Sequence, residues 1–255
     1  RICQGLALTP AFFEESDRLY AVPTTTYGDG RVTGDKHFVE WGSHADMYLV
    51  TAVEDGIPGL ALVPRNQLGV SPHPLRSIGG TPQAVVTCHD AETEGWLPGA
   101  GGVTSLRQLG GAMASLESYA YAQKALDMTV DYAGLRVQFG RPIGAFGAVQ
   151  TRCADMATIV EASKFLSREL LDRLGWGEVD EALVATAKAV TARMAPEVAM
   201  EAHLLHGGIG FMREYSLQLY TRRAKEASLR WGTAAETLTA VGDALLLDPA
   251  QAELT

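Results

Sequence analysis

The sequence has few cysteines, and their spacing is not that of a metal or disulfide motif. Only Cys3, Cys88 and Cys153 are present among 255 residues, and no two of them form a CxxC pair. This absence excludes a cysteine-ligated zinc site and a disulfide framework. A site at Cys88-His-Asp-Ala-Glu92 is also rejected, because neighbouring residues of a strand point to opposite faces. We therefore expect no bound metal and a reducing, cytoplasmic environment.

Long hydrophobic runs and an excess of positive charge are absent as well. No apolar segment approaches the roughly 18 residues of a transmembrane helix, and the first ten residues lack the pattern of a signal peptide. Thirty acidic residues outnumber 21 basic ones, which gives a net charge of −9. This balance argues against nucleic acid as a partner, because phosphate backbones are bound by clustered lysine and arginine. It does not argue against a small anionic ligand. The sequence begins without a methionine, which is compatible with part of a longer chain.

The residues that are present divide the chain into two halves. Up to about Gly102 the sequence is rich in glycine, proline and threonine, with short apolar runs at 47–53 and 84–88. Short runs separated by turn residues predict β-strands, so residues 1–104 are expected to form a β-sandwich or barrel. The stretch Leu-Pro-Gly-Ala-Gly-Gly at 97–102 predicts a linker.

The second half has the periodicity of long helices. From 149 to 174, apolar residues recur mostly at intervals of three or four, as one face of a helix requires. The segments 112–135, 181–205 and 233–247 follow the same pattern. Four helices joined by short loops predict an antiparallel four-helix bundle over residues 105–255. The expected fold class is therefore α+β.

Two strings contain residues suited to a phosphate-bearing ligand. In Arg136-Val-Gln-Phe-Gly-Arg-Pro-Ile143, Arg136 offers a forked cation and Phe139 a flat apolar surface. The alternative is a helix C-terminus that Gly140 ends. In the string from Leu204 to Phe211, three glycines permit either close approach of a ligand or a sharp turn between helices. His206 within it is either a base or a structural hydrogen bonder.

Five strings in the second half, taken in order, resemble the acyl-CoA dehydrogenase family. They are "RVQFGRPIGAFGAVQ", "ADMA", "LLHGGIGFMREY", "YTRRAK" and "RWGT". In the first half, "YGDGRVTGDKHFVEWGSHADMYLV" is similar to a hairpin of the family's β-domain, and "ALTP" stands where the family has a "TEPGAGSD"-like loop. The resemblance implies the family's β-domain followed by its four-helix bundle, with the family's N-terminal helical domain missing.

The resemblance also implies an activity. Acyl-CoA dehydrogenases use FAD to introduce a double bond between the α and β carbons of an acyl-CoA thioester. A carboxylate base removes the α-proton while the β-hydride moves to the flavin. The implied partners are an acyl-CoA substrate and an electron-accepting flavoprotein.

Position by position, the resemblance implies cofactor-binding residues in both halves. Arg136 matches an arginine that meets the flavin pyrophosphate across a subunit interface, and a glycine pair lies near the adenosine end. The β-domain residues match contacts beside the flavin ring. The implied set is Arg136, Gln138, Phe139, Gly207, Gly208, Thr233, Thr9 and Phe38.

Both positions at which the family places its catalytic base lack a carboxylate here. Most members carry glutamate directly before the Gly-Thr pair, where this chain has Trp231, whose indole can only donate a hydrogen bond. A minority carry it early in the first bundle helix, where Gly110 and Gly111 stand. The family's substrate-orienting arginine is missing too. Other family positions are filled by Leu204, Glu40 and Gly147.

Three interpretations follow from this pattern. In our main hypothesis the chain is the non-catalytic subunit of a heteromeric α2β2 dehydrogenase of the steroid-degrading type, and it shares an FAD site while a partner supplies the base. The absent domain and base favour an open pocket and a bulky, steroid-derived acyl group. Alternatively the chain is self-sufficient with a relocated base, or it is a structural paralogue that binds neither ligand. Candidates for a relocated base, each otherwise a surface carboxylate, are Glu14, Glu15, Glu40 and Glu117.

Overall fold

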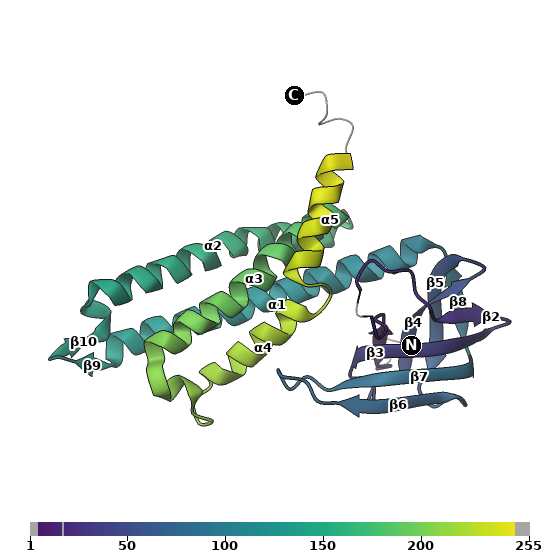
Figure 1. Ribbon diagram of the computed structural model, residues 1–255, viewed down its shortest axis with the longest axis horizontal. Coiled ribbons are helices and arrows are strands. Elements are labelled where there is room, and N and C mark those ends of the chain that lie inside the picture. The colour runs from purple at the N-terminus through teal and green to yellow at the C-terminus, as the bar shows by residue number, and fades with distance from the viewer. Residues whose placement is uncertain (1–4, 17, 248–255) are drawn as a thin grey trace. The chain divides into compact units, whose positions relative to one another are not determined.

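The computed structural model describes residues 5–16 and 18–247 of the chain. These residues form two compact units, and the boundary between the units falls between Arg107 and Gln108. In Figure 1 the first unit is a sheet of strands and the second is a set of long helices. Cys3 lies outside the described residues.

The first unit is built on one eight-stranded sheet. Neighbouring strands follow the order β6-β7-β3-β2-β4-β5-β8, and β1 pairs with β4 in parallel. Asp29-Gly30 and Asp55-Gly56 form the tight turns from β2 to β3 and from β4 to β5, all four with positive φ. Asp-Gly favours such two-residue hairpin turns. The strands are β1 (Leu8–Ala11), β2 (Thr26–Gly28), β3 (Arg31–Glu40), β4 (Met47–Glu54), β5 (Ile57–Pro64), β6 (Val70–Leu75), β7 (Gln83–Glu92) and β8 (Gly95–Pro98).

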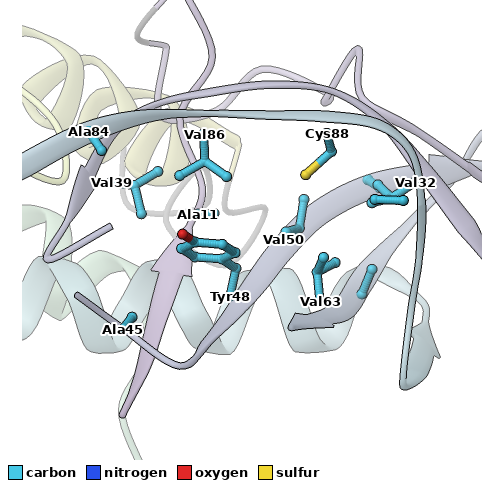
Figure 2. Packing of buried hydrophobic residues seen from close by; sticks show 13 residues of the cluster. Ala11, Val32, Val39, Ala45, Tyr48, Val50, Val63, Ala84, Val86 and Cys88 are labelled. Atoms are coloured by element: carbon cyan, nitrogen blue, oxygen red, sulfur yellow. The ribbon is translucent and has the colours of Figure 1, made fainter. Parts of the chain in front are cut away.

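Alternation along the strands places one set of side chains in a common core. On β7, Ala84, Val86 and Cys88 are buried, while Val85 and Thr87 between them are less so. Figure 2 shows the buried side chains of β7 meeting those of β3, β4 and β5. Burial raises the pKa of the Cys88 thiol to about 11, because the thiolate would lose its hydration. Cys88 is therefore a core residue.

The predicted linker at 97–102 is not a linker. Its first residues end β8, and the following helix, α1, begins at Ala100. One glycine serves close packing: a Cβ added to Gly102 would lie 3.1 Å from side-chain atoms of both Leu60 and Leu97, which would have to move slightly. Gly102 therefore allows close packing in the first unit, while Gly99, with φ 102°, lies between β8 and α1.

The expected β-domain followed by a helical bundle is confirmed, with one helix more than the periodicity predicted. The unexpected helix is α4, whose sequence is dominated by polar residues such as Arg222, Arg223 and Lys225. Helix α1 also starts well before the predicted residue 112. The helices of the described chain are α1 (Ala100–Leu135), α2 (Gly147–Trp176), α3 (Glu181–His206), α4 (Leu217–Leu229) and α5 (Ala234–Leu247), with short 3-10 turns at Ile143–Ala145 and Gly207–Phe211.

Small side chains form much of the core that α1 to α4 share. Ala122 and Ala125 of α1 and Ala195 and Ala202 of α3 are fully buried in one cluster. Alanine at these positions lets helix backbones approach closely. The core of the second unit is thus set by α3, whose buried residues continue along its whole length.

The part of the chain that the structure describes lacks both a membrane-spanning helix and a metal-binding cluster. None of its helices has the length and hydrophobicity needed to cross a membrane. It also contains no group of three His, Cys, Asp or Glu residues placed to hold a metal ion.

Candidate functional site

The residues expected to meet a pyrophosphate lie on a small hairpin after α1. Helix α1 ends at Leu135, and strand β9 (Val137–Gln138) pairs with strand β10 (Arg141–Pro142). The turn residues Phe139 and Gly140 have φ angles of 52° and 78°. Positive φ at both central positions is the requirement of a type I′ two-residue hairpin turn. The alternative in which Gly140 ends the helix is therefore wrong, because Gly140 belongs to the hairpin.

This hairpin presents a cation and an aromatic ring to solvent. Phe139 is 93% exposed, although its ring meets Phe146 edge to face. The Arg136 guanidinium makes no hydrogen bond or ion pair with the described residues, and Gln138 donates to the Val137 carbonyl beside it. A phosphate next to a flat apolar group would match Arg136 and Phe139 together.

The Gly207-Gly208 turn at the end of α3 exposes bare main chain. Gly207 has φ 63° and ψ −145°, a conformation that glycine adopts without strain and other residues do not. No described atom lies within 4 Å of a Cβ added to Gly207 or Gly208. A ligand can therefore approach the backbone of this turn closely.

Two buried histidines support the glycine turn. His206 Nδ1 donates to a main-chain carbonyl one helical turn back, at 2.7 Å, so its Nε2 accepts from the Tyr215 hydroxyl at 3.1 Å. His203 is protonated at Nε2 instead, because the Thr221 hydroxyl at 2.8 Å already donates to a main-chain carbonyl. His206 thus has the structural role, which was one of its two interpretations.

Acidification is expected to destabilise the helical unit through these histidines. Burial lowers the pKa of both rings, and the charge of His206 lowers that of His203 further. In the unfolded chain each pKa returns to about 6.5. The free energy of unfolding is therefore retained above that pH and falls as the pH drops below it. Urea unfolding at about pH 7.5 and pH 5.5 measures this slope. We expect His206→Gln to reduce the dependence of the unfolding free energy on pH, and His89→Gln, at an exposed position, to leave it unchanged. Equal pH dependence in the two variants would contradict the role of the buried histidines.

The turn Arg230–Thr233 joins α4 to α5, and its capping box is confirmed. The Glu236 carboxylate accepts from the Thr233 N–H at 3.0 Å and from its hydroxyl at 2.9 Å. The Glu236 N–H donates back to the Thr233 hydroxyl oxygen at 3.3 Å. Trp231 and Gly232 before it both have positive φ, 54° and 97°. Thr233 therefore starts α5 after a tightly constrained turn.

Trp231 packs directly on Gly110. Its side chain is buried, and a Cβ added to Gly110 would lie 2.1 Å from the indole Cδ2. Only glycine leaves room for the ring at this position. Trp231 and Gly110 replace the two carboxylates that the resemblance would place here, so the shared space is filled by an apolar ring. Next to it, Arg230 forms an ion pair with Glu117 of α1 at 2.7 Å.

In the first unit, Thr9 and Phe38 lie on β1 and β3. The Thr9 hydroxyl donates to the Glu40 main-chain carbonyl at 2.6 Å and links the two strands. Phe38 lies in an irregular part of β3, where the pairing with β7 shifts register between Lys36 and Val39. A bulge of this kind redirects side chains, and Phe38 has φ 54° and is 43% exposed. Phe38 is thus available to a ligand, while the Thr9 hydroxyl hydrogen is already donated.

The carboxylates considered as relocated bases have different surroundings. Glu14 accepts from Lys36 at 2.8 Å and from the N–H and hydroxyl groups of Thr24 and Thr25. Burial alone would raise the pKa of Glu14, but these hydrogen bonds and the Lys36 charge lower it to about 2. A carboxylate with that pKa is a poor base, and Glu14 is not a surface carboxylate either. Glu15 is exposed, and Glu40 ends β3.

Two further departures from the pattern of the resemblance lie on helices of the second unit. Leu204 is an exposed residue on α3, and Gly147 is the first residue of α2. The structure adds one residue that the sequence interpretation missed, Lys188, which is fully buried in α3. Its signal in the sequence is a single charged residue inside the otherwise small and apolar string "VATAKAVTA".

Comparison with known proteins assigns the chain to a family. Residues 106–246 match the acyl-CoA dehydrogenase C-terminal domain. The chain therefore belongs to the acyl-CoA dehydrogenase family. Members of this family are FAD flavoproteins, so FAD is the cofactor of its class.

Individual relatives agree with this assignment. The probable acyl-CoA dehydrogenase YngJ of Bacillus subtilis strain 168 is 31% identical over 79% of the chain and 57% of its own length. The ChsE4-ChsE5 complex from Mycobacterium tuberculosis is 27% identical, with TM-score 0.87 over 95% of this chain and 67% of that one. A variant of the steroid ACAD Tcur3481-Tcur3483 is 27% identical, with TM-score 0.86 over 97% and 68%. The chain spans little more than half of the curated relative.

The described residues of the second unit fit one part of FAD. Arg136, whose guanidinium has no partner among the described residues, and the uncovered Phe139 belong to the same exposed segment, and the main chain of the Gly207-Gly208 turn is open. Cations and open main chain are suited to a dinucleotide's phosphates. The fit concerns binding only, since no carboxylate stands at Trp231 or Gly110.

Proposed function

We propose that the chain is a subunit of an FAD-dependent acyl-CoA dehydrogenase that desaturates an acyl-CoA thioester between its α and β carbons. Bound FAD would supply the hydride acceptor. Arg136, with Gln138 and Phe139 beside it, would bind the pyrophosphate region, and Gly207 and Gly208 would lie against the adenosine end. Thr233 would contact the cofactor at the start of α5, and Thr9 and Phe38 would contribute from the β-domain. An electron-accepting flavoprotein would reoxidise the enzyme.

In this proposal a second, unlike subunit supplies the catalytic base. The observation that carries it is the packing of Trp231 on Gly110, because the indole fills the space in which either family base would stand. An indole cannot accept a proton from an α-carbon. Among the alternative bases, Glu14 forms an ion pair with the buried Lys36, and the pKa of the Glu14 carboxyl is about 2. A heterotetramer with half of its potential sites inactive agrees with these features.

The relatives support this assembly and a bulky substrate. One similar structure is the ChsE4-ChsE5 complex, and another is a variant of the steroid ACAD Tcur3481-Tcur3483. We infer that the acyl group is a large ring-bearing one, such as a steroid-derived CoA thioester. A CoA thioester series from short linear to steroid side-chain acyl groups, assayed on the assembled complex, tests this part. Preference for short linear substrates would contradict it.

Flavin content tests the assembly. The chain is purified alone and after co-expression with the product of its neighbouring gene, and the visible spectrum is recorded. We expect FAD only in the complex, with one FAD for about two chains. A yellow chain that desaturates acyl-CoA on its own would instead support a relocated base. A colourless, inactive complex would support a structural paralogue.

Arg136→Ala is expected to remove FAD from the complex, because it deletes the unpaired guanidinium beside Phe139. A charge-assisted contact to phosphate contributes about 1.5 to 3 kcal/mol, which corresponds to a loss of ten- to hundredfold in affinity. Arg141→Ala is the matched control, since Arg141 lies on the same hairpin but stacks on Phe146 at 4.2 Å. FAD titration monitored by flavin fluorescence measures both variants. Equal affinities for the two variants would contradict the role of Arg136.

A further inference from the structure

Lys188 is a buried cation without a carboxylate partner among the described residues. It lies in the middle of α3 and is fully buried. Its ammonium donates to the main-chain carbonyls of Ala227 and Ser228, at 3.1 and 3.0 Å. Burying a lysine in this way is costly, because a charge loses its hydration and gains only neutral acceptors. Because burying the Lys188 ammonium destabilises the folded chain, we expect this lysine to have a specific role.

The two acceptors are in the last turn of α4. The last four carbonyls of a helix have no partner within the helix, and the negative end of the helix dipole lies there. Helix α4 ends at Leu229, so the Lys188 ammonium satisfies two of these carbonyls from the adjacent helix. Lys188 therefore fixes where α4 ends and in which direction the chain leaves it.

The residues that leave α4 are those of the turn Arg230–Thr233. Helix α1 holds this turn through the Glu117–Arg230 ion pair and through Gly110 beneath Trp231. Helix α5 holds it through the Thr233–Glu236 capping box. Lys188 of α3 binds the last turn of α4, directly before this turn, so α1, α3 and α5 all contribute contacts around it.

We propose that Lys188 is a positioning residue, which sets the conformation of the turn Arg230–Thr233 by capping the end of α4. Without it, the Ala227 and Ser228 carbonyls lose their partner, and the turn shifts together with the Trp231 indole. The consequence for cofactor binding at Thr233 rests on the proposed function. The position of the turn does not.

The charges around Lys188 make its role depend on pH. Burial and, to a smaller extent, the nearby Arg230 lower the pKa of Lys188 to about 7, while Glu236 of α5 opposes the shift. Glu117 of α1 faces Arg230 and neutralises part of its charge. Near neutral pH the ammonium becomes an amine, and its attraction to the helix end weakens. The turn should respond in the same pH range.

Fluorine NMR of the full chain labelled with 5-fluorotryptophan tests the proposal. The sequence has four tryptophans, and loss of one resonance in Trp231→Phe assigns Trp231. We expect Lys188→Met, which keeps the length of the side chain and removes the ammonium, to shift the Trp231 resonance. Lys164→Met is the control, because Lys164 forms only an exposed ion pair with Glu161 on α2. A Trp231 resonance at the wild-type position in folded Lys188→Met would overturn the proposal.

A pH titration decides the matter if Lys188→Met does not fold. In the wild-type chain, the Trp231 resonance is expected to move with a midpoint near pH 7, whereas no movement between about pH 6 and 9 would overturn the proposal. Flavin content is measured on the complex in parallel. Absence of flavin from every sample would contradict the proposed function and leave the Trp231 result intact, so the two failures are distinguishable.

Discussion

Gly110→Ala is expected to destabilise the helical unit by about 2 kcal/mol, although alanine is the better helix former. The new methyl group would lie 2.1 Å from the Trp231 ring. That ring is buried and its backbone is held in a left-handed conformation, so it has little freedom to withdraw. The overlap therefore outweighs the gain of about 1 kcal/mol that alanine brings to a helix interior. Urea unfolding monitored by circular dichroism measures the difference.

Gly134→Ala is the matched control for this prediction. It lies in the same helix and is exposed, and a Cβ there meets no described atom within 4 Å, so the substitution should be neutral or stabilising. A double-mutant cycle adds a second comparison. In a Trp231→Ala background, Gly110→Ala should lose most of its cost because the overlapping ring is gone. Additive costs of the two substitutions would show that the residues do not share one space.

Glu14→Gln is expected to destabilise the β-unit by about 3 kcal/mol, the usual effect of removing one member of a buried ion pair. Glutamine keeps most of the hydrogen-bonding capacity toward Thr24 and Thr25, but it leaves the ammonium of fully buried Lys36 without a countercharge. Glu15→Gln is the control, since the neighbouring carboxylate is exposed. Thermal unfolding of the two variants at neutral pH is the measurement, and similar losses in both would contradict the assignment.

The same ion pair gives the β-unit a defined acid sensitivity. The pKa of Glu14 is about 2 in the folded chain against an ordinary value of 4.5. Its stabilisation is therefore complete above pH 4.5 and is lost as the pH falls toward 2. In Glu14→Gln this part of the pH dependence should be missing.

The features predictable from the sequence were those that repeat along the chain. Short apolar runs with Asp-Gly turns predicted the strands, and intervals of three or four predicted the long helices. Helix α4 was not among the four predicted bundle helices, because its basic, polar residues obscure a narrow buried face. The stretch 97–102 was misinterpreted because Gly102 serves packing at Leu60 and Leu97, and composition alone does not distinguish packing from flexibility.

The site was predictable only in part, because its important contacts join distant residues. A glycine at 110 and a tryptophan at 231 are separate departures in the sequence, and only the fold shows that each requires the other. Lys188 and the two carbonyls it binds are likewise some forty residues apart, as Lys36 and Glu14 are twenty-two apart. Such pairings depend on which helices and strands are adjacent, and periodicity does not specify that. The cofactor roles of the exposed residues remain proposals.

The hairpin β9–β10 has a consequence for how the chain associates with other molecules. Its two-residue turn already holds Phe139 in place, with φ fixed at 52° and the ring 93% uncovered. Whatever covers that ring gains apolar contact while the chain loses little conformational entropy, since the loop has no disorder to give up. The complex formed there should therefore dissociate slowly. Before it forms, the uncovered ring adds to the exposed apolar surface of the chain, so the chain should be more soluble with its partner than without it.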